Sequence, residues 1–224
     1  MRAIDELGID IDDMLFVCGI GCGGWIPSPN INGDSLHTPH GRAIAFATGA
    51  KMFNPRLKVM VISGDGDLMD IGGNHLLHAV WRNIDLTVIC ANNMLYGMTG
   101  GQACMTTPKD AYTQTTTQGN PYYPFKICEV MAVAGAPYVA RYAVTQPFQL
   151  IRSIKKALQT TGFTFIEAVS TCPTQFGRRN QLGTPSDMLK FLKEKCITRK
   201  KAASLSKEEL KGKIVTGEFT DGED

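Results

Sequence analysis

Two short apolar runs with a helical stretch between them form the clearest pattern along this chain. Residues 57–63 and 86–91 are rich in Val, Ile and Leu, and each run ends in a glycine or asparagine turn. Short runs of this kind are typical of buried parallel strands. Residues 68–83 are long enough for a crossover helix, so we predict that the two strands are parallel neighbours.

The same alternation continues along the chain. We predict further strands over residues 14–18, 138–143 and 163–170, and helices over residues 42–53, 125–134 and 147–160. Alternating strands and helices predict an α/β fold with a single doubly wound, mostly parallel sheet in residues 1–185. Residues 186–224 are predicted to add a C-terminal helix capped by Ser186 and then, from residue 198, a polar arm against a partner.

Composition narrows the functional classes. The chain has 224 residues, of which 43% are hydrophobic and 20% charged, as in a soluble globular protein. Its formal charge of +2 and the lack of a basic stripe argue against nucleic acid as a partner. No apolar run approaches the roughly 20 residues of a membrane span, and the charged N-terminus lacks the apolar core of a signal peptide. We therefore expect a cytoplasmic protein without a membrane partner.

Polar turns follow both strands of the first unit. Residues 64–67 (Gly-Asp-Gly-Asp) come after the first strand and residues 92–93 (Asn-Asn) after the second. Parallel neighbours lie about 4.8 Å apart, so side chains just past their carboxyl ends can meet on one ion. Mg²⁺ accepts one or two protein oxygen ligands together with phosphate oxygens. We predict Asp65, Asn93 and the Leu95 carbonyl as Mg²⁺ ligands; the alternative is that both pairs are ordinary turns.

Glycines in the first turn predict a diphosphate beside the metal. Gly64 and Gly66 permit close approach of the backbone, so their loop amides can donate to phosphate oxygens at the N-terminus of the following helix. Asp67 is predicted to cap that helix or to present its own amide to phosphate. Residues 96–124 form a long polar loop, which in a compact domain usually serves as a ligand loop or a lid.

The motif of residues 64–67 and 92–93 resembles the diphosphate-binding motif of thiamine diphosphate enzymes. The wider pattern resembles the β subunit of the 2-oxoacid:ferredoxin oxidoreductases, over nearly all the chain up to about residue 180. The resemblance rests on residues 19–22, 40–43, 64–70, 92–93, 96–102 and 172–174. Residues 172–180 are most similar to the 2-oxoglutarate branch of that family.

This resemblance implies cofactors and partners. It implies oxidative decarboxylation of a 2-oxoacid to an acyl-CoA, with coenzyme A and ferredoxin as acceptors. It also implies an α subunit that supplies the pyrimidine-binding half and the activating glutamate, and further γ and δ subunits. The residues that it places at thiamine diphosphate and Mg²⁺ are Gly21, Cys22, Gly64, Asp65, Gly66, Asp67, Asn93, Leu95, Tyr96, Gly97, Met98 and Thr99.

Residues for catalysis and substrate binding follow from the same resemblance. It places His40 near the thiazolium ring or the substrate, whereas a lone histidine is more often structural. Trp25 stands where many relatives have a basic residue, so substrate recognition does not carry over simply. Arg42 and Gln102 are further candidates, and residues 178–179 (Arg-Arg) can clamp a dicarboxylate or serve an interface.

Two of the seven cysteines, Cys22 and Cys172, match half of a [4Fe–4S] ligand set in related β subunits. Such a cluster needs four thiolates, and the Cys-x-x-Cys pair that supplies the others is not found in this chain. We expect that the chain either is N-terminally short or has lost the cluster; the alternative is two buried thiols. Two other functions stay open: the small chain of a non-oxidative thiamine diphosphate decarboxylase, and a non-catalytic assembly subunit.

Overall fold

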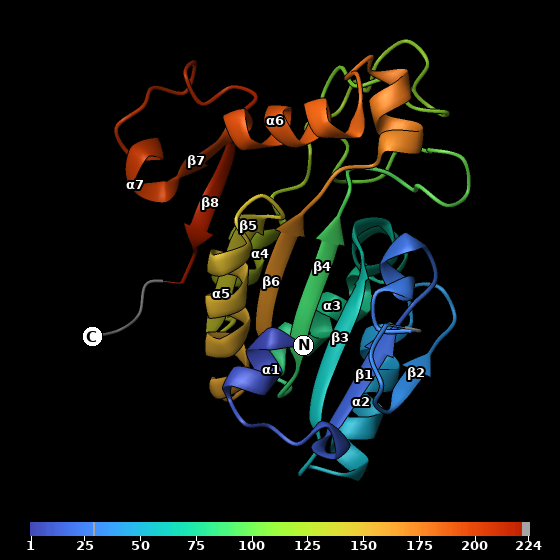
Figure 1. The fold of residues 1–224 in the computed structure, drawn as a ribbon, viewed down its shortest axis with the longest axis vertical. Helices are drawn as coiled ribbons and strands as arrows, with labels where there is room; N and C mark the ends of the chain where they lie inside the picture. Colours follow the sequence, from blue (N-terminus) through green and yellow to red (C-terminus); the bar gives the residue numbers. More distant parts are fainter. Residues whose placement is uncertain (29, 221–224) are drawn as a thin grey trace.

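The computed structural model describes residues 1–28 and 30–220, which form one eight-stranded sheet in the order β2-β1-β3-β4-β6-β5-β8-β7 (Figure 1). Every neighbouring pair is parallel except β5 with β8. The prediction of a single, mostly parallel α/β sheet is therefore confirmed. The strands are β1 (Met14–Cys18), β2 (Ser35–His37), β3 (Lys58–Gly64), β4 (Thr87–Asn92), β5 (Tyr138–Ala143), β6 (Thr164–Val169), β7 (Cys196–Thr198) and β8 (Ile214–Glu218).

Helices cover both faces of the sheet. One face packs against α2, α3 and α4 through side chains such as Val17, Val61 and Val88. The opposite face packs against α1 and α5 through Phe16 and Met60. Within the described residues, no helix is both long and apolar enough to cross a membrane. The helical segments are α1 (Arg2–Glu6), η1 (Ile11–Asp13), η2 (Cys22–Trp25), α2 (Ala43–Phe53), η3 (Gly66–Ile71), α3 (Gly73–Trp81), α4 (Ile127–Val133), α5 (Pro147–Gln159), η4 (Pro173–Gly177), α6 (Pro185–Lys195) and α7 (Arg199–Ala202).

The predicted strand–crossover–strand unit is present, but its crossover is not one helix. β3 and β4 are parallel neighbours, and Gly64 lies opposite Ala91. The crossover begins as the π-helical turn η3, in which the Gly72 amide donates to the Asp67 carbonyl at 3.0 Å. The α-helix α3 starts only after Gly72. π-Helical turns are rare in proteins overall, but those that occur are frequently found at functional sites.

The C-terminal segment differs from the prediction. Thr184, not Ser186, caps α6: its side chain accepts from the Asp187 amide, and Asp187 bonds back to Thr184 in a capping box. Part of the predicted polar arm packs on the sheet of this chain, because β8 pairs antiparallel with β5. Residues 221–224 of the predicted arm lie outside the described residues. The division of the chain at residue 185 stays a prediction.

Candidate magnesium and diphosphate site

Four strand tips meet at the carboxyl edge of the sheet. The strands β1, β3, β4 and β6 are consecutive parallel neighbours, so the turns that follow them lie side by side. The glycine-rich turn after β1 packs directly on the tip of β3. A Cβ built at Gly23 would lie only 2.5 Å from the backbone nitrogen of Gly64. Only glycine permits this approach, and it brings the first turn next to the Gly-Asp-Gly-Asp turn.

Asp65 is a buried carboxylate without a counter-ion. It is 2% exposed, and no Lys, Arg or His among the described residues forms an ion pair with it. Its Oδ2 accepts from the Met94 amide at 3.1 Å, from the Cys104 thiol at 3.2 Å and from the Thr106 hydroxyl. Burial raises the pKa of Asp65 to about 6, although the bonds from Thr106 and Cys104 act to lower it. Such a carboxylate is a suitable ligand for a divalent cation.

The turn after β4 lies against Asp65. Met94 has a φ of 71°, a left-handed conformation that costs a non-glycine residue about 1–2 kcal/mol. Its amide donates to Asp65 Oδ2 and also to Asn92 Oδ1 at 2.9 Å, and its carbonyl accepts from the Thr107 hydroxyl at 2.7 Å. Asn93 and Leu95, the predicted ligands, flank this residue. The structure thus brings the Asp65 turn and the Asn93 turn together.

The hydrogen-bond partners of the Asp67 side chain differ from those predicted. Its carboxylate does not cap the following helix. Instead it accepts from the amides of Ile20 at 3.2 Å and Gly41 at 2.7 Å and from the Ser63 hydroxyl at 2.8 Å. It also pairs with Nδ1 of His40. The reason is packing: the turn after β1 and the loop before α2 both place donors over η3, so Asp67 joins three segments.

His40 is held in one orientation. Asp67 binds its Nδ1, and its ring meets the ring of Tyr96 edge-on, with 5.9 Å between centroids. The Tyr96 hydroxyl donates to the Gly66 carbonyl at 3.2 Å, which fixes the second ring. The His40 side chain is 38% exposed. When Nδ1 donates to the carboxylate, Nε2 is left as the acceptor that can exchange a proton with a bound molecule.

Cys22 and Cys172 come together at Gly97. A Cβ built at Gly97 would lie 3.3 Å from Sγ of Cys22, 3.4 Å from Sγ of Cys172 and 3.5 Å from Nδ2 of Asn93. Burial, and then the neighbouring Cys172, raise the pKa of the Cys22 thiol. No group of three or more His, Cys, Asp or Glu in the described residues is arranged to hold a metal. The two thiols found here are half of the ligand set of a [4Fe–4S] cluster, and the cluster stays a prediction.

The other candidates occupy the rim of this edge. Thr99 and Gln102 bind each other, with the Thr99 hydroxyl donating to Gln102 Oε1 at 2.7 Å. Arg42 donates to the Gly41 carbonyl at 3.3 Å. Trp25 is 57% exposed. Gly21 (φ 126°) precedes η2, and Met98 is exposed on the long loop.

The arginine pair serves the long loop. The Arg179 guanidinium donates to Gln114 Oε1 at 2.6 Å and to the Gly100 carbonyl at 3.3 Å. Asn180, the next residue, donates to the Tyr112 carbonyl at 3.0 Å. These contacts fix the loop of residues 96–124 over the sheet edge. They assign Arg179 a structural contact with the long loop.

Sequence reasoning missed the residues that support the turns. Thr106 and Thr107 come from the long polar loop, in which no spacing marks them. Ser63 lies inside a strand, where its hydroxyl donates to Asp67. A buried hydrogen-bond network extends away from the site through Asn92, Glu167 and Arg141. Of these three residues, sequence reasoning had singled out only Asn92, as the first asparagine of the Asn-Asn pair.

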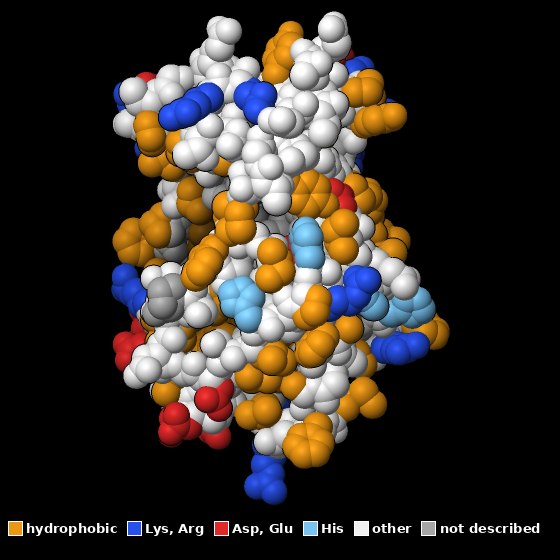
Figure 2. All heavy atoms as spheres, turned by 90° about the vertical axis from the view of Figure 1, so that its right-hand side faces the viewer, with side chains coloured by type: hydrophobic (Ala, Val, Ile, Leu, Met, Phe, Trp, Pro, Cys, Tyr) orange, Lys and Arg blue, Asp and Glu red, His pale blue; other side chains and the backbone are white. Residues whose placement is uncertain are grey.

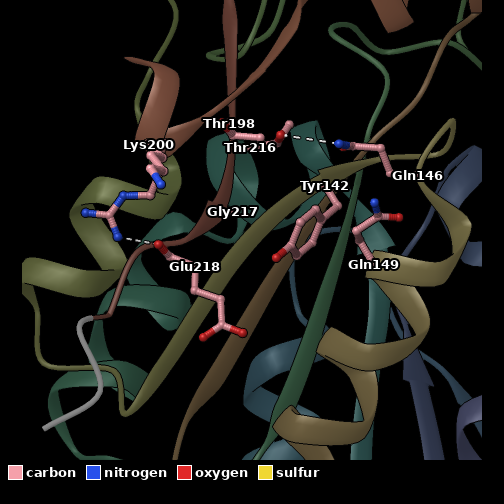
Figure 3. A pocket seen from close by; sticks show the side chains of 9 residues that line it. Tyr142, Gln146, Gln149, Thr198, Lys200, Thr216, Gly217 and Glu218 are labelled. Atoms are coloured by element: carbon pink, nitrogen blue, oxygen red, sulfur yellow. Dashed lines mark hydrogen bonds between the residues drawn. The ribbon is translucent and has the colours of Figure 1, made fainter. Parts of the chain in front are cut away.

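The described residues form two surface cavities of similar size, among others. One, of about 460 Å³, is lined mostly by the long loop, and its wall includes Cys104, Asp70, Asn120 and Tyr122. The other, of about 380 Å³, lies where the C-terminal segment joins the sheet (Figure 3). Tyr142, Thr216 and Glu218 face into it from β5 and β8. No predicted site residue lines either cavity, but Cys104, which donates to Asp65, lies in the wall of the first.

Comparisons with known proteins give the following matches. Residues 22–168 match the family model described as thiamine pyrophosphate enzyme, C-terminal TPP binding domain. The chain is 51% identical over 220 residues to the 2-oxoglutarate synthase subunit KorB of Methanothermobacter marburgensis, covering 98% of this chain and 77% of that protein. It is 53% identical over 221 residues to the subunit of the same name from Methanocaldococcus jannaschii, covering 99% and 82%.

A solved structure matches over the full length of this chain. It is the 2-oxoglutarate:ferredoxin oxidoreductase from Magnetococcus marinus with 2-oxoglutarate, coenzyme A and succinyl-CoA bound. The TM-score is 0.85 at 31% sequence identity, and the match covers 100% of this chain and 76% of the other.

Proposed function

Because the chain belongs to the β subunits of the 2-oxoacid:ferredoxin oxidoreductases, which carry the thiamine pyrophosphate-binding domain, we propose that it holds the magnesium–diphosphate half of thiamine diphosphate. The substrate that we propose is 2-oxoglutarate, as the names of its relatives suggest. The observation that carries this proposal is the buried Asp65 carboxylate, which lacks an ion pair in the described chain and touches the turn of Asn93 and Leu95.

The proposed Mg²⁺ ligands are Asp65, the Asn93 side chain and the Leu95 carbonyl. Thr106 and Cys104 support the role of Asp65, because both donate to Oδ2 and so keep the carboxylate in place. Burial, and then the nearby Asp65, raise the pKa of the Cys104 thiol to about 12, so the thiol stays protonated and donates. The amides of the glycine turn at the start of η3 are the proposed donors to the diphosphate.

The catalytic residue that we propose is His40. Thiamine diphosphate, when bound, supplies the carbon nucleophile and the electron sink of 2-oxoacid decarboxylation. The chain's own contribution is to hold and move a proton at Nε2 of His40, while Asp67 keeps Nδ1 protonated and the ring in place. Tyr96 packs against the ring and excludes water from that side.

For the carboxylates of the substrate we propose Arg42 as the main contact, with Trp25 and Gln102 as lesser candidates. No carboxylate among the described residues forms an ion pair with Arg42. Its guanidinium donates to the backbone carbonyls of Gly41 and Ile71 at 3.3 and 3.5 Å, and a stronger bidentate bond to a carboxylate can replace these.

The partner that we propose is an α subunit that completes the cofactor site. An uncovered apolar surface on α2 and α3 supports this, and Figure 2 shows hydrophobic side chains gathered over the flank that includes α2. Large surfaces of this kind mark protein interfaces. We further propose coenzyme A as the acyl acceptor and ferredoxin as the electron acceptor. The γ and δ subunits stay a prediction. The surface consists of Phe46 (46% exposed), Met52 (72%), Phe53 (92%), Leu77 (46%) and Trp81 (72%).

The test uses the chain purified in complex with its α partner. Calorimetric titration with thiamine diphosphate should give binding that requires Mg²⁺ and is lost with EDTA. Asp65→Ala and Asn93→Ala should each abolish it, and both should abolish succinyl-CoA formation coupled to reduction of a viologen dye. Unchanged turnover in Asp65→Ala would refute the proposal. It would leave the chain as an assembly subunit.

A further inference from the structure

We propose that Asn92, held by the buried Glu167–Arg141 ion pair, is a positioning residue that presents the Asn93 and Leu95 ligands to Mg²⁺. The inference rests on the proposed function, because it assumes that this turn binds the metal. The inference goes beyond the proposed function by assigning a role to a buried charged network that the proposed reaction does not use.

Both ends of the Asn92 amide are engaged. Nδ2 donates to Glu167 Oε1 at 2.6 Å, and Oδ1 accepts from the Met94 amide at 2.9 Å. Asn92 is 6% exposed and Glu167 is 3% exposed. Rotating the amide by half a turn would place its oxygen against the carboxylate and its NH₂ against the Met94 N–H. Asn92 therefore has only one satisfactory orientation.

Glu167 is itself fixed from the other side. Its Oε2 accepts from Arg141 Nε at 2.6 Å and from the Cys128 thiol at 3.2 Å. Arg141 also donates to Glu129 of α4 at 3.0 Å and to the Val215 carbonyl at 3.3 Å. Val215 belongs to β8 and directly precedes Thr216, which lines the cavity in Figure 3. The network thus runs from the C-terminal strand to the tip of β4.

The network ends on the strained residue of the metal turn. Met94 is left-handed, and its amide is shared between Asn92 and the proposed metal ligand Asp65. Without Asn92, Asp65 alone would hold this amide, and the turn would lose the contact that fixes its conformation. Asn93 and Leu95 would then lose their fixed separation, and with it the preformed geometry that a small cation requires.

A purely structural role does not explain the choice of residues. Apolar side chains of similar volume can often replace a buried ion pair without loss of stability. A carboxylate suits this position because Asn92 Nδ2 and Arg141 Nε both donate to it, so each of its two oxygens accepts from one of them and the Asn92 oxygen points to Met94. The charge of Glu167 in turn requires Arg141, and burial of the pair gives Asn92 a rigid support.

The experiment measures how thiamine diphosphate binding depends on Mg²⁺ in the complex with the α partner. Asn92→Ala removes both hydrogen bonds. The double variant Asn92→Asp with Glu167→Gln reverses the donor and acceptor between the two residues and keeps the Met94 bond. Tyr138→Phe is the control, because it removes a buried hydroxyl that bonds Ser153 at 2.9 Å and lies outside the site. Circular dichroism gives the melting temperature of each variant.

We expect Asn92→Ala to raise the half-saturating Mg²⁺ concentration at least tenfold, in line with the 10–100-fold effects of residues that orient metal ligands. The double variant should stay within threefold of the wild type, and so should Tyr138→Phe even where its melting temperature falls. If Asn92→Ala does not fold, Glu167→Gln replaces it with an expected rise of at least threefold. The inference is overturned if Asn92→Ala and Tyr138→Phe show the same half-saturating Mg²⁺ concentration. It is also overturned if the double variant does not return to near the wild-type value.

The wild-type complex separates this inference from the proposed function. If it binds thiamine diphosphate without any need for Mg²⁺, the proposed function fails and this inference fails with it. If it needs Mg²⁺ and Asn92→Ala does not change that need, only the present inference fails.

Discussion

The substitution Asp65→Asn should stabilise the metal-free chain while it disables the site. Burial raises the pKa of Asp65 from 3.8 to about 6, so the folded chain binds this proton more tightly than the unfolded chain. The stability that this proton contributes is complete below about pH 4 and is lost as the pH rises through about 6. At pH 8 the buried charge therefore costs about 3 kcal/mol, from roughly 1.4 kcal/mol per pKa unit. Asparagine carries no charge and avoids this cost.

The size of the gain depends on the three donors that face Oδ2. An asparagine oxygen can still accept from Met94, Cys104 and Thr106, but its NH₂ group has to fit where the other carboxylate oxygen was. We therefore expect a gain of about 1–3 kcal/mol at pH 8 and almost none at pH 4. For a chain of this size each kcal/mol moves the melting temperature by roughly 2–4 °C.

Urea unfolding of the isolated chain in EDTA, followed by far-ultraviolet circular dichroism between pH 4 and 8, measures this gain. Asp187→Asn is the control, because Asp187 is an exposed capping residue whose pKa is lowered by its bonds to Thr184; it should not reproduce the gain. A gain of equal size at both pH values would refute the electrostatic reasoning. So would a loss of stability in Asp65→Asn at pH 8.

Three further predictions concern the same edge of the sheet. Mg²⁺-dependent cofactor binding should weaken about tenfold per pH unit below pH 6, because the metal competes with a proton on Asp65; calorimetry at stepped pH checks this. His40→Asn should lower kcat about 100-fold or more and leave the Kd of thiamine diphosphate nearly unchanged, as steady-state kinetics and titration will show. Gly66→Ala should cost about 1–3 kcal/mol in urea unfolding, because its Cβ would lie 2.4 Å from the Tyr96 ring, whereas Gly64→Ala, with no atom within 4 Å, should not.

The elements that position the site were predictable because their signals are local. The apolar runs before Gly64 and Asn92 are long and rich in β-branched residues, and each ends in a turn signal. Once both strands are parallel neighbours, the geometry of the sheet alone places Asp65 beside the turn after β4. The alternation of strands and helices predicted that these turns lie together at the carboxyl edge of a parallel sheet. The observed strand order agrees with that prediction.

The role of Asp67 could not be predicted, because it depends on contacts between distant residues. Its donors Ile20 and Gly41 lie in two loops that the chain pattern leaves undefined, and they are 47 and 26 residues away in sequence. The same holds for Thr106, which is 41 residues from Asp65. A turn motif shows that donors are needed, but the path of the loop decides which residue supplies them.

The C-terminal strand was missed for a different reason. β8 has five residues and pairs with β5 at only two register positions, Ala140 with Glu218 and Arg141 with Gly217. Its sequence, Ile-Val-Thr-Gly-Glu, has neither a continuous apolar run nor a regular alternation of apolar and polar residues. Its position depends on single contacts such as the Arg141 bond to the Val215 carbonyl. The cap of α6 was a different case, since Thr184 followed by Pro185 and Asp187 is a readable capping signal that we assigned to the wrong residue.

Three unfavourable local features meet at one place in this fold. Asp65 is a buried charge without a cation among the described residues, Met94 is a left-handed non-glycine residue, and Asn92 is held by a buried ion pair. All three converge on the Met94 amide. A sequence normally avoids such features, and they persist where function requires them. A cation at Asp65 would remove the first cost directly and would use the geometry that the other two maintain, which is why we place the metal here and not at the cavity beside β8.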